Sequence, residues 1–344
     1  MSVFAAATGI GSWPGSSPRE AAEIVIGELH TLPHLVELPA RGVGADMIGR
    51  AGALLVDIGI DTVPRGYRIA NGRSAVLRRA ASLLDEDIDT LEEAWEKAGL
   101  RGGSRTVKVQ APGPITLAAQ LELPGGHRAI TDPGAVRDLA GSLAEGVAAH
   151  RAQLERRLDT PVVVQFDEPS LPAVLTGRVP TPSGYGTVRA VSGSAAADVL
   201  RALIAAVGVP VALHCCADRP PLDVLGAVGA VAIGVDATLP SVAGRTASPA
   251  ALDAFGAVWD AGTPLLLGMV PARDPGGRPT SRALARTAFD LADRLGFDRE
   301  RLAHLAVPTP TCGLAGADPA WARRALALCR ELGEAFVDPP EERD

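Results

Sequence analysis

The chain has 344 residues, of which 47% are hydrophobic and 21% are charged, the balance of a folded protein. At about 150 residues per domain, this length predicts either two domains or one large barrel. The formal net charge is −7 and the basic residues form no cluster along the chain. This pattern argues against nucleic acid and against an anionic membrane surface as partners.

Cysteine content and hydropathy indicate the compartment. Only four cysteines are present, too few for the disulfide scaffold of a secreted protein. The start of the chain, MSVFAAATGIGSWPG, lacks the basic region of a signal peptide, and no apolar run reaches the length of about 18 residues that spans a bilayer. We therefore expect a soluble, cytoplasmic protein.

Short apolar segments alternate with stretches of helical periodicity along the whole chain. The predicted strands are Ala7–Gly11, Ile60–Val63, Thr106–Gln110, Val162–Phe166, Pro210–His214, Val231–Val235, Leu265–Gly268 and Leu305–Val307. The predicted helices are Pro18–Leu29, Ala45–Asp57, Ile88–Ala98, Asp132–Leu158, Ala195–Val207, Pro221–Val228, Pro249–Ala261, Thr280–Leu295 and Asp318–Phe336. Asp318 would cap the last helix, with Pro319 in its first turn.

Eight repeats of strand and helix predict an α/β fold, a single (β/α)8 TIM-type barrel over residues 1–338. A doubly wound sheet is the alternative. Leu32–Arg50 and Val179–Ser194 are predicted as long loops over the C-terminal face of the barrel, and Pro339–Asp344 as a charged tail. Because the loops at that face build the active sites of such barrels, residues at the strand ends are the functional candidates.

Candidate metal ligands follow three of the predicted strands. His214 and Cys216 are two residues apart on an extended segment and face one side, while Cys215 faces the helices. Asp236 follows the next strand, and Cys312 follows the last one. A histidine beside a cysteine at one strand end is commonly a packing arrangement. Residues of this kind at three strand ends favour a tetrahedral zinc site, with one zinc per chain.

A zinc site with an exchangeable position has a natural chemical use. Zinc lowers the pKa of a bound thiol and keeps it as a thiolate, which is a nucleophile for an alkyl group. Zinc-activated water is the competing use. Cys329, on an apolar face of the last helix, is expected to be a core residue.

Further motifs are spread over nearly the whole chain. They are Thr8-Gly9-Ile10-Gly11-Ser12-Trp13-Pro14, Glu37 followed by Asp46-Met47, Gly113-Pro114-Ile115-Thr116 and Asp167-Glu168-Pro169. With the candidate zinc ligands and Cys312-Gly313-Leu314, their order and spacing resemble the C-terminal catalytic barrel of the cobalamin-independent methionine synthases. That family belongs to the superfamily that includes uroporphyrinogen decarboxylase. Most of these motifs are weak singly, and their combination carries the resemblance.

The resemblance implies a zinc-dependent methyltransferase that transfers a methyl group to the thiol of homocysteine and forms methionine. It implies zinc ligands at His214, Cys216, Asp236 and Cys312. Of these, His214, Cys216 and Cys312 form the expected catalytic set. Two thiolates and one carboxylate outweigh the charge of Zn²⁺, and this excess would keep a bound sulfur nucleophilic.

The same resemblance implies an amino acid site beside the metal. The backbone at Ile10, Gly11 and Ser12 would hold the carboxylate of homocysteine. Glu37 and Asp167 would receive its amino group. Elementary chemistry agrees, because backbone N–H groups bind anions and carboxylates bind an ammonium group.

Four positions depart from the family pattern. Asp236 stands where the family has a glutamate, and Gln120 stands where it has a tryptophan against the folate ring. The family's acidic contact to the pterin falls near Ala173 in this chain. The family's histidine acid falls in a stretch of this chain that ends at Arg273. Arginine cannot donate a proton near neutral pH.

Three of these departures concern the methyl donor. The positions that would bind the methyl acceptor match the family, except that Asp236 is shorter than the family's glutamate. We therefore predict that the acceptor is homocysteine or a related small thiol, and that the donor has changed. The donor is methyl-folate in the family. A methyl-corrinoid, free or protein-bound, would suit this chain because its cobalt(I) leaving group needs no proton.

Two other functions stay open from the sequence. One is a metal-free barrel enzyme like the decarboxylases of the superfamily, with Arg65 and Arg68 holding substrate carboxylates near the end of the second strand. The other is a non-catalytic protein that binds methionine, a corrinoid or zinc. Metal content separates the first from a zinc enzyme, and tight binding without turnover would identify the second.

Overall fold

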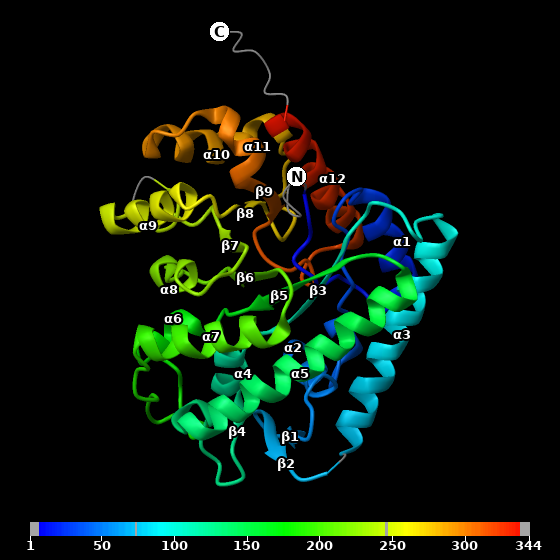
Figure 1. The fold of residues 1–344 in the computed structure, drawn as a ribbon, viewed down its shortest axis with the longest axis vertical. Coiled ribbons are helices and arrows are strands. Elements are labelled where there is room, and N and C mark those ends of the chain that lie inside the picture. Colours follow the sequence, from blue (N-terminus) through cyan, green and yellow to red (C-terminus); the bar gives the residue numbers. More distant parts are fainter. Residues whose placement is uncertain (1–6, 73, 245–246, 338–344) are drawn as a thin grey trace.

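The computed structural model describes residues 7–72, 74–244 and 247–337, and its centre is a curved parallel sheet (Figure 1). The sheet has six strands in chain order, namely β3 (Val107–Pro112), β5 (Val162–Asp167), β6 (Val211–Cys215), β7 (Ala232–Asp236), β8 (Leu265–Val270) and β9 (Ala306–Pro310). All five neighbouring pairs are parallel. The six strands match the third to eighth predicted strands, with ends that differ by at most three residues.

Two extended segments, 8–13 and 31–37, complete the barrel between β9 and β3. The backbone bonds that join them to each other and to the sheet are Thr8 N to Pro308 O, Glu37 N to Gly11 O, Trp13 N to Glu37 O, Leu35 N to Lys108 O and Lys108 N to Pro33 O. Six strands and two segments make the eight positions of a TIM-type barrel. The predicted fold class is therefore confirmed, and segment 8–13 fills the first position as expected.

The second predicted strand was placed wrongly. Ile60–Val63 lies in β1 (Gly59–Val63), which pairs antiparallel with β2 (Gly66–Ala70) in a hairpin outside the barrel. A third short strand, β4 (Leu121–Glu122), joins β2 in parallel. Segment 31–37 takes the second barrel position, although the sequence analysis placed most of it in a loop. Only one of the five residues of β1 is buried, as in a surface hairpin, whereas a barrel strand is buried on both faces.

Helices surround the sheet (Figure 1). They are α1 (Pro18–Glu28), α2 (Met47–Gly52), α3 (Ala75–Lys97), α4 (Pro114–Gln120), α5 (Pro133–Leu158), α6 (Leu171–Leu175), α7 (Gly193–Val207), α8 (Leu222–Gly226), α9 (Pro249–Asp260), α10 (Ser281–Leu295), α11 (Leu302–Leu305) and α12 (Pro319–Val337). Short 3₁₀ turns span Pro39–Arg41, Ala129–Thr131 and Arg299–Arg301. Asp318 caps α12 as expected, since its carboxylate accepts from Trp321 N–H at 2.9 Å. No helix in the described ranges is both long and apolar enough to cross a membrane.

Several helix predictions need correction. The helix expected over Ala45–Asp57 is confined to α2, and the one expected over Ile88–Ala98 is only the second half of the longer α3. The short helices α4 and α6 were not expected, because five to seven residues contain too few turns to show a period. The expected tail Pro339–Asp344 lies outside the described residues, and a single domain over residues 1–338 remains a prediction.

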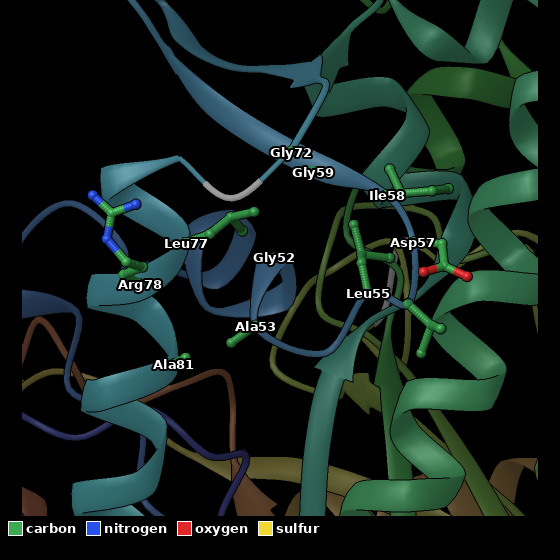
Figure 2. A pocket seen from close by; sticks show the side chains of 11 residues that line it. Gly52, Ala53, Leu55, Asp57, Ile58, Gly59, Gly72, Leu77, Arg78 and Ala81 are labelled. Atoms are coloured by element: carbon green, nitrogen blue, oxygen red, sulfur yellow. The ribbon is translucent and has the colours of Figure 1, made fainter.

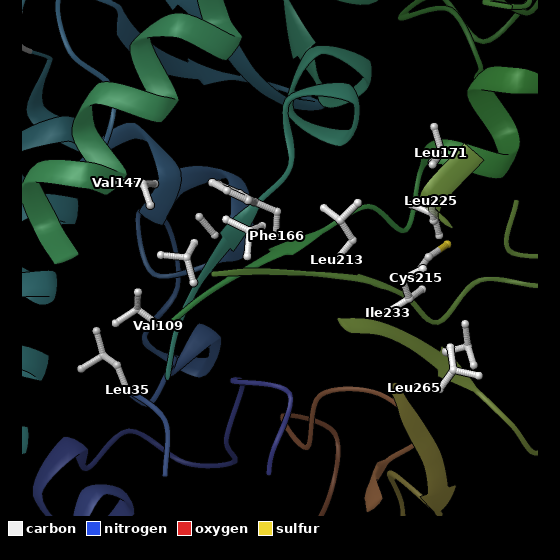
Figure 3. Close-up of a cluster of buried hydrophobic side chains, with 14 of the residues drawn as sticks. Leu35, Val109, Val147, Phe166, Leu171, Leu213, Cys215, Leu225, Ile233 and Leu265 are labelled. Carbon is white, nitrogen blue, oxygen red and sulfur yellow. The ribbon is translucent and has the colours of Figure 1, made fainter. Parts of the chain in front are cut away.

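The hydrophobic core lies between the sheet and its helices. Figure 3 shows Val109, Phe166, Leu213, Ile233 and Leu265 from successive strands, all fully or almost fully buried. Cys215 belongs to the same layer and is completely buried, so it faces the helices as expected. Alternation along each strand therefore turns the intervening residues into the barrel.

The barrel interior has an apolar floor and polar layers above it. The floor is a separate cluster of six buried side chains: Leu32, Val163, Ala212, Ala232, Leu266 and Val307. Two residues further along the strands stand Gln165, His214 and Thr309, all buried. The polar layers thus lie towards the C-terminal ends of the strands, where TIM-type barrels place their sites.

Candidate metal and amino acid site

The residues predicted to hold the metal and the amino acid come together at the C-terminal ends of the barrel strands. Asp167 ends β5, His214 and Asp236 lie at the ends of β6 and β7, and Cys312 follows β9. The adjacent barrel segments bring Ser12 and Glu37 to the same face, where they form a parallel bridge. The folded chain therefore gathers residues that lie up to 300 positions apart (Ser12 to Cys312).

His214 is oriented by Asp167. The ring Nδ1 and Oδ1 of Asp167 are 2.7 Å apart, and both side chains are buried. The other ring nitrogen, Nε2, is buried without a hydrogen-bond partner. Gly234 on β7 leaves room for the ring, since a Cβ there would lie 2.9 Å from His214 Cδ2. A carboxylate on one nitrogen and an unpaired second nitrogen is the arrangement of a metal-binding histidine.

Cys216 and Cys312 form a close pair. Their sulfur atoms are 2.6 Å apart, and both cysteines are free thiols rather than a disulfide. The hydrogen bond between the two sulfurs lowers the pKa of Cys312 to about 6, and nearby His214 adds to this effect. The same bond and burial hold the pKa of Cys216 well above its usual range. The pair thus stabilises one thiolate, the donor type that zinc prefers.

Asp236 is arranged differently from the other three predicted ligands. Its Oδ1 accepts from the backbone N–H of Thr238 at 2.9 Å and from the Thr238 hydroxyl at 2.6 Å. Burial raises the pKa of this half-buried carboxyl, and His214 opposes the shift, so the two groups share one neighbourhood. In the part of the chain that the structure describes, no three His, Cys, Asp or Glu side chains stand in a ready metal-binding arrangement.

The predicted carboxylate-binding turn is held next to the cysteine loop. Leu314 N–H donates to the Ser12 carbonyl at 2.9 Å, and a Cβ at Gly313 would fall 2.0 Å from Ser12 Oγ. Gly11 has φ of 145°, and a Cβ there would lie 2.6 Å from the side chain of Gln110. Glycine is required at Gly11 on both grounds. The turn at Ile10–Ser12 and the loop at Cys312 therefore form one wall of the site.

Glu37 carries a largely buried carboxyl beside a buried ion pair. Burial raises its pKa to about 7, and Arg50, whose Nε is 3.8 Å away, opposes the shift. Arg50 is committed to Asp87, with which it pairs directly. The Asp167 carboxylate also raises the pKa of Glu37, whereas Lys108 lowers it. The two acids therefore favour a nearby cation, and Lys108 already supplies one to both.

We expect the raised pKa of Glu37 to make stability depend on pH. Its pKa is about 7 in the folded protein and 4.5 ordinarily, so the folded state holds the proton more tightly. The free energy of unfolding should then fall as pH rises from about 4.5 to 7, by at most about 3 kcal/mol for this group. Urea unfolding at pH 5 and pH 8 measures the difference. Glu37→Gln should reduce it, and identical differences in wild type and variant would contradict the assignment.

Three buried polar residues near the site are not among the predicted site residues. Glu168 is fully buried and accepts from Ile115 N–H at 3.0 Å and from Thr116 N–H at 2.7 Å, so it ties β5 to the start of α4. Lys108 and Gln165 lie inside the barrel. A signal was present for these two, because each stands two residues before another polar residue in an otherwise apolar strand.

The positions that depart from the family's donor site are scattered. Gln120 is exposed at the end of α4 and donates to Ser170 Oγ at 3.3 Å. Ala173 on α6 helps to line a pocket of about 430 Å³, together with Arg178 and Arg219. Arg273 follows β8 and packs against Gly316, at 3.1 Å from a Cβ built there. None of these side chains takes part in the metal or amino acid arrangement described above.

The arginines of the decarboxylase alternative lie elsewhere than expected. Arg65 is at the tip of the β1–β2 hairpin and donates to the carbonyl of Pro182 at 2.7 Å. Arg68 lies on β2, opposite Asp61. Both belong to the hairpin outside the barrel, so the expectation that they mark the end of a barrel strand is wrong.

Another pocket, of about 550 Å³, lies between α2, the start of β1 and the first turns of α3 (Figure 2). Its lining includes Gly52, Asp57, Gly72 and Arg78. It contains no residue that the sequence analysis assigned to the site.

The comparisons with known proteins identify the family. The chain resembles the solved B12-independent methionine synthase from Shewanella sp. W3-18-1 in complex with selenomethionine, with a TM-score of 0.60 and 12% identity, over 96% of this chain and 97% of that one. A likeness at this identity shows the fold. The carboxyl transferase domain of Rhizobium etli pyruvate carboxylase has a TM-score of only 0.34 at 16% identity, over 98% of this chain and 56% of that one.

No curated protein sequence matches the chain. The profile of the family described as the cobalamin-independent synthase catalytic domain matches residues 4–335, which is nearly the whole length. The chain therefore belongs to the cobalamin-independent methionine synthase family, as its motifs predicted.

Proposed function

We propose that this chain is a zinc-dependent methyltransferase that methylates the thiol of homocysteine and forms methionine. The observation that carries the proposal is the buried, unpaired Nε2 of His214, beside a pair of cysteine sulfurs and oriented by Asp167. A buried polar atom without a partner is costly, and a metal ligand bond would satisfy it. His214, Cys216 and Cys312 would hold the zinc.

When zinc is bound, its charge lowers the pKa of a thiol that reaches it. Asp236 would complete the set by turning away from Thr238, or would stay there and leave a position for the substrate sulfur. The protein's own residues do the positioning: Asp167 holds the tautomer of His214, since the Nδ1–H donates to its carboxylate.

The amino acid end of homocysteine would lie between the turn at Ile10–Ser12 and the acids Glu37 and Asp167. Backbone N–H groups of Gly11 and Ser12 suit the carboxylate. Glu37 and Asp167 suit the ammonium group, because a nearby cation lowers the free energy of both buried carboxylates. Fixed in this way, the sulfur can attack a methyl group in line, and positioning supplies much of the rate.

The donor side differs from the family pattern. Gln120, Ala173 and Arg273 replace the tryptophan, acid and histidine of the folate site, and Arg273 cannot supply a proton at neutral pH. We propose a methyl-corrinoid donor, free or carried by another protein, with methyl-folate as the alternative. The reduced cysteine pair suits the cytoplasm, where we propose the protein acts.

Methyl transfer to homocysteine tests the donor directly. The zinc-loaded protein should form methionine from homocysteine with methylcobalamin, and should form it much more slowly with methyltetrahydrofolate. Mass spectrometry of the methionine product measures both rates, with the Cys312→Ser variant as the control for uncatalysed transfer. Enzyme-like rates with methyltetrahydrofolate and none with methylcobalamin would reject the corrinoid but keep the methyltransferase.

A further inference from the structure

A buried lysine lies inside the barrel and the function proposed above does not use it. Lys108 on β3 is 0% exposed, and it is one of only two lysines in the chain. Burial lowers the pKa of Lys108 to about 8, while Asp167 and Glu37 both favour its charged form. A lysine is seldom buried without a purpose, because desolvating its charge costs free energy that its partners must offset.

Lys108 and Gln165 form a small hub between the two halves of the amino acid site. Lys108 Nζ lies 2.6 Å from Gln165 Oε1 and 3.3 Å from the carbonyl of Ile10. Gln165 Nε2 donates to the same carbonyl at 2.9 Å and to Asp167 Oδ1 at 2.8 Å. All four groups are buried, so these bonds have no competition from solvent.

Lys108, Ile10 and Asp167 together determine which way the Gln165 amide points. An ammonium group can only donate, so it must face the amide oxygen. The amide nitrogen is then turned to Ile10 O and Asp167 Oδ1, both of which can only accept. The turned-over amide would place its oxygen against a carboxylate and its nitrogen against the ammonium group, and both contacts are repulsive.

The hub also fixes the peptide unit between Ile10 and Gly11. Two donors hold the Ile10 carbonyl, and in a planar trans peptide the N–H of Gly11 points the opposite way. Clamping the oxygen therefore aims the N–H that the proposed function assigns to the substrate carboxylate. The same amide holds Asp167, which is assigned to the substrate ammonium group.

We propose that Lys108, acting through Gln165, is a positioning residue that sets the spacing between the carboxylate-binding turn and the ammonium-binding Asp167. The two charged groups of an α-amino acid are attached to one carbon, so their separation is fixed and the site must match it. This inference rests on the proposed function and deepens it. It predicts that loss of the hub harms ligands with both groups far more than ligands with one.

Three thiols allow ligands with both charged groups to be compared with ligands that have one. They are homocysteine, 3-aminopropanethiol, which lacks the carboxylate, and 4-mercaptobutanoate, which lacks the amino group. Calorimetry on the zinc-loaded protein measures the affinity for each. Lys108→Met should weaken homocysteine binding by about tenfold or more and each truncated thiol by less than about threefold, since each end can adjust alone. A lysine with only a structural role would weaken all three alike, and that result would overturn the inference.

Gln165→Glu is the second variant, in case Lys108→Met folds poorly. It keeps the size of the side chain and an oxygen for Lys108, but removes the N–H donors to Ile10 and Asp167. The same selective loss for homocysteine is expected. Lys97→Met is the matched control, because Lys97 is exposed and pairs with Glu23 on the surface. It should leave all three affinities unchanged.

The outcomes distinguish this inference from the function beneath it. Wild-type protein that binds none of the three thiols rejects both. Wild-type protein that binds homocysteine, with Lys108→Met and Gln165→Glu binding it equally well, rejects the positioning role alone. Zinc content is measured in every sample, and loss of zinc from either variant would also count against a role confined to the amino acid end.

Discussion

Replacing Cys312 by serine is expected to reduce methyl transfer to homocysteine by about a thousandfold or more, equivalent to about 4 kcal/mol of transition-state stabilisation. Cys312 belongs to the Cys216–Cys312 pair, and its contact with Cys216 lowers its pKa to about 6. Serine is a poor zinc ligand and stays protonated, so the variant should lose both the metal and the charge. Steady-state kinetics with metal analysis of the same samples measures both effects.

The matched control is Cys215→Ala. Cys215 is next to Cys216 in the chain but faces the helices, where burial raises its pKa to about 12. We expect a loss of stability from the smaller side chain, with zinc content and turnover within a few-fold of wild type. A Cys312→Ser protein that keeps a tenth of wild-type activity would contradict the proposed site, as would a Cys215→Ala protein that loses its zinc.

Asp167→Asn is expected to weaken zinc binding by about ten- to a hundredfold, the usual effect of losing a carboxylate behind a metal-binding histidine. The sequence indicated only a contact with the substrate amino group. In the structure, Asp167 Oδ1 also accepts from His214 Nδ1 at 2.7 Å and from Gln165. The neutral amide can no longer stabilise the imidazole, and it removes the negative charge offered to the substrate.

The two effects of Asp167→Asn can be separated. Zinc affinity is measured by competition with a chelator, and homocysteine binding is measured afterwards at saturating zinc. Both should fall, whereas Asp198→Asn, which alters an exposed pair with Arg201, should change neither. Unchanged zinc affinity in Asp167→Asn would mean that His214 does not bind zinc through Nε2, and that the observation carrying the proposed function has another explanation.

Most barrel strands could be predicted because they are apolar on both faces. β8 (LLLGMV) is an apolar run and β5 (VVVQFD) begins with one, as is typical of parallel strands covered on both faces. Segment 31–37 could not be recognised in this way, since Pro33 and His34 interrupt it and it makes few ladder bonds. The hairpin strand β1 has strand-like residues, and the sequence contains nothing that excludes it from the barrel.

The candidate site was predictable where spacing along one strand defined it. His214 and Cys216 share a face by alternation, and the structure turns Cys215 to the helices. The bond between Asp167 and His214 depends on neighbouring strands in a register that the sequence does not reveal. Likewise, the burial of Glu168 and Lys108 is decided by partners more than 50 residues away.

Zinc per chain in the purified wild-type protein, measured by metal mass spectrometry, tests the central claim most directly. We predict one zinc per chain, lost in Cys216→Ser and retained in Cys329→Ser, since Cys329 is buried in α12 away from the site. That result would direct the work to methyl donors. A wild-type protein that holds no zinc, even after growth in zinc-supplemented medium, would contradict the proposed thiol chemistry and leave the buried Nε2 of His214 without its ligand.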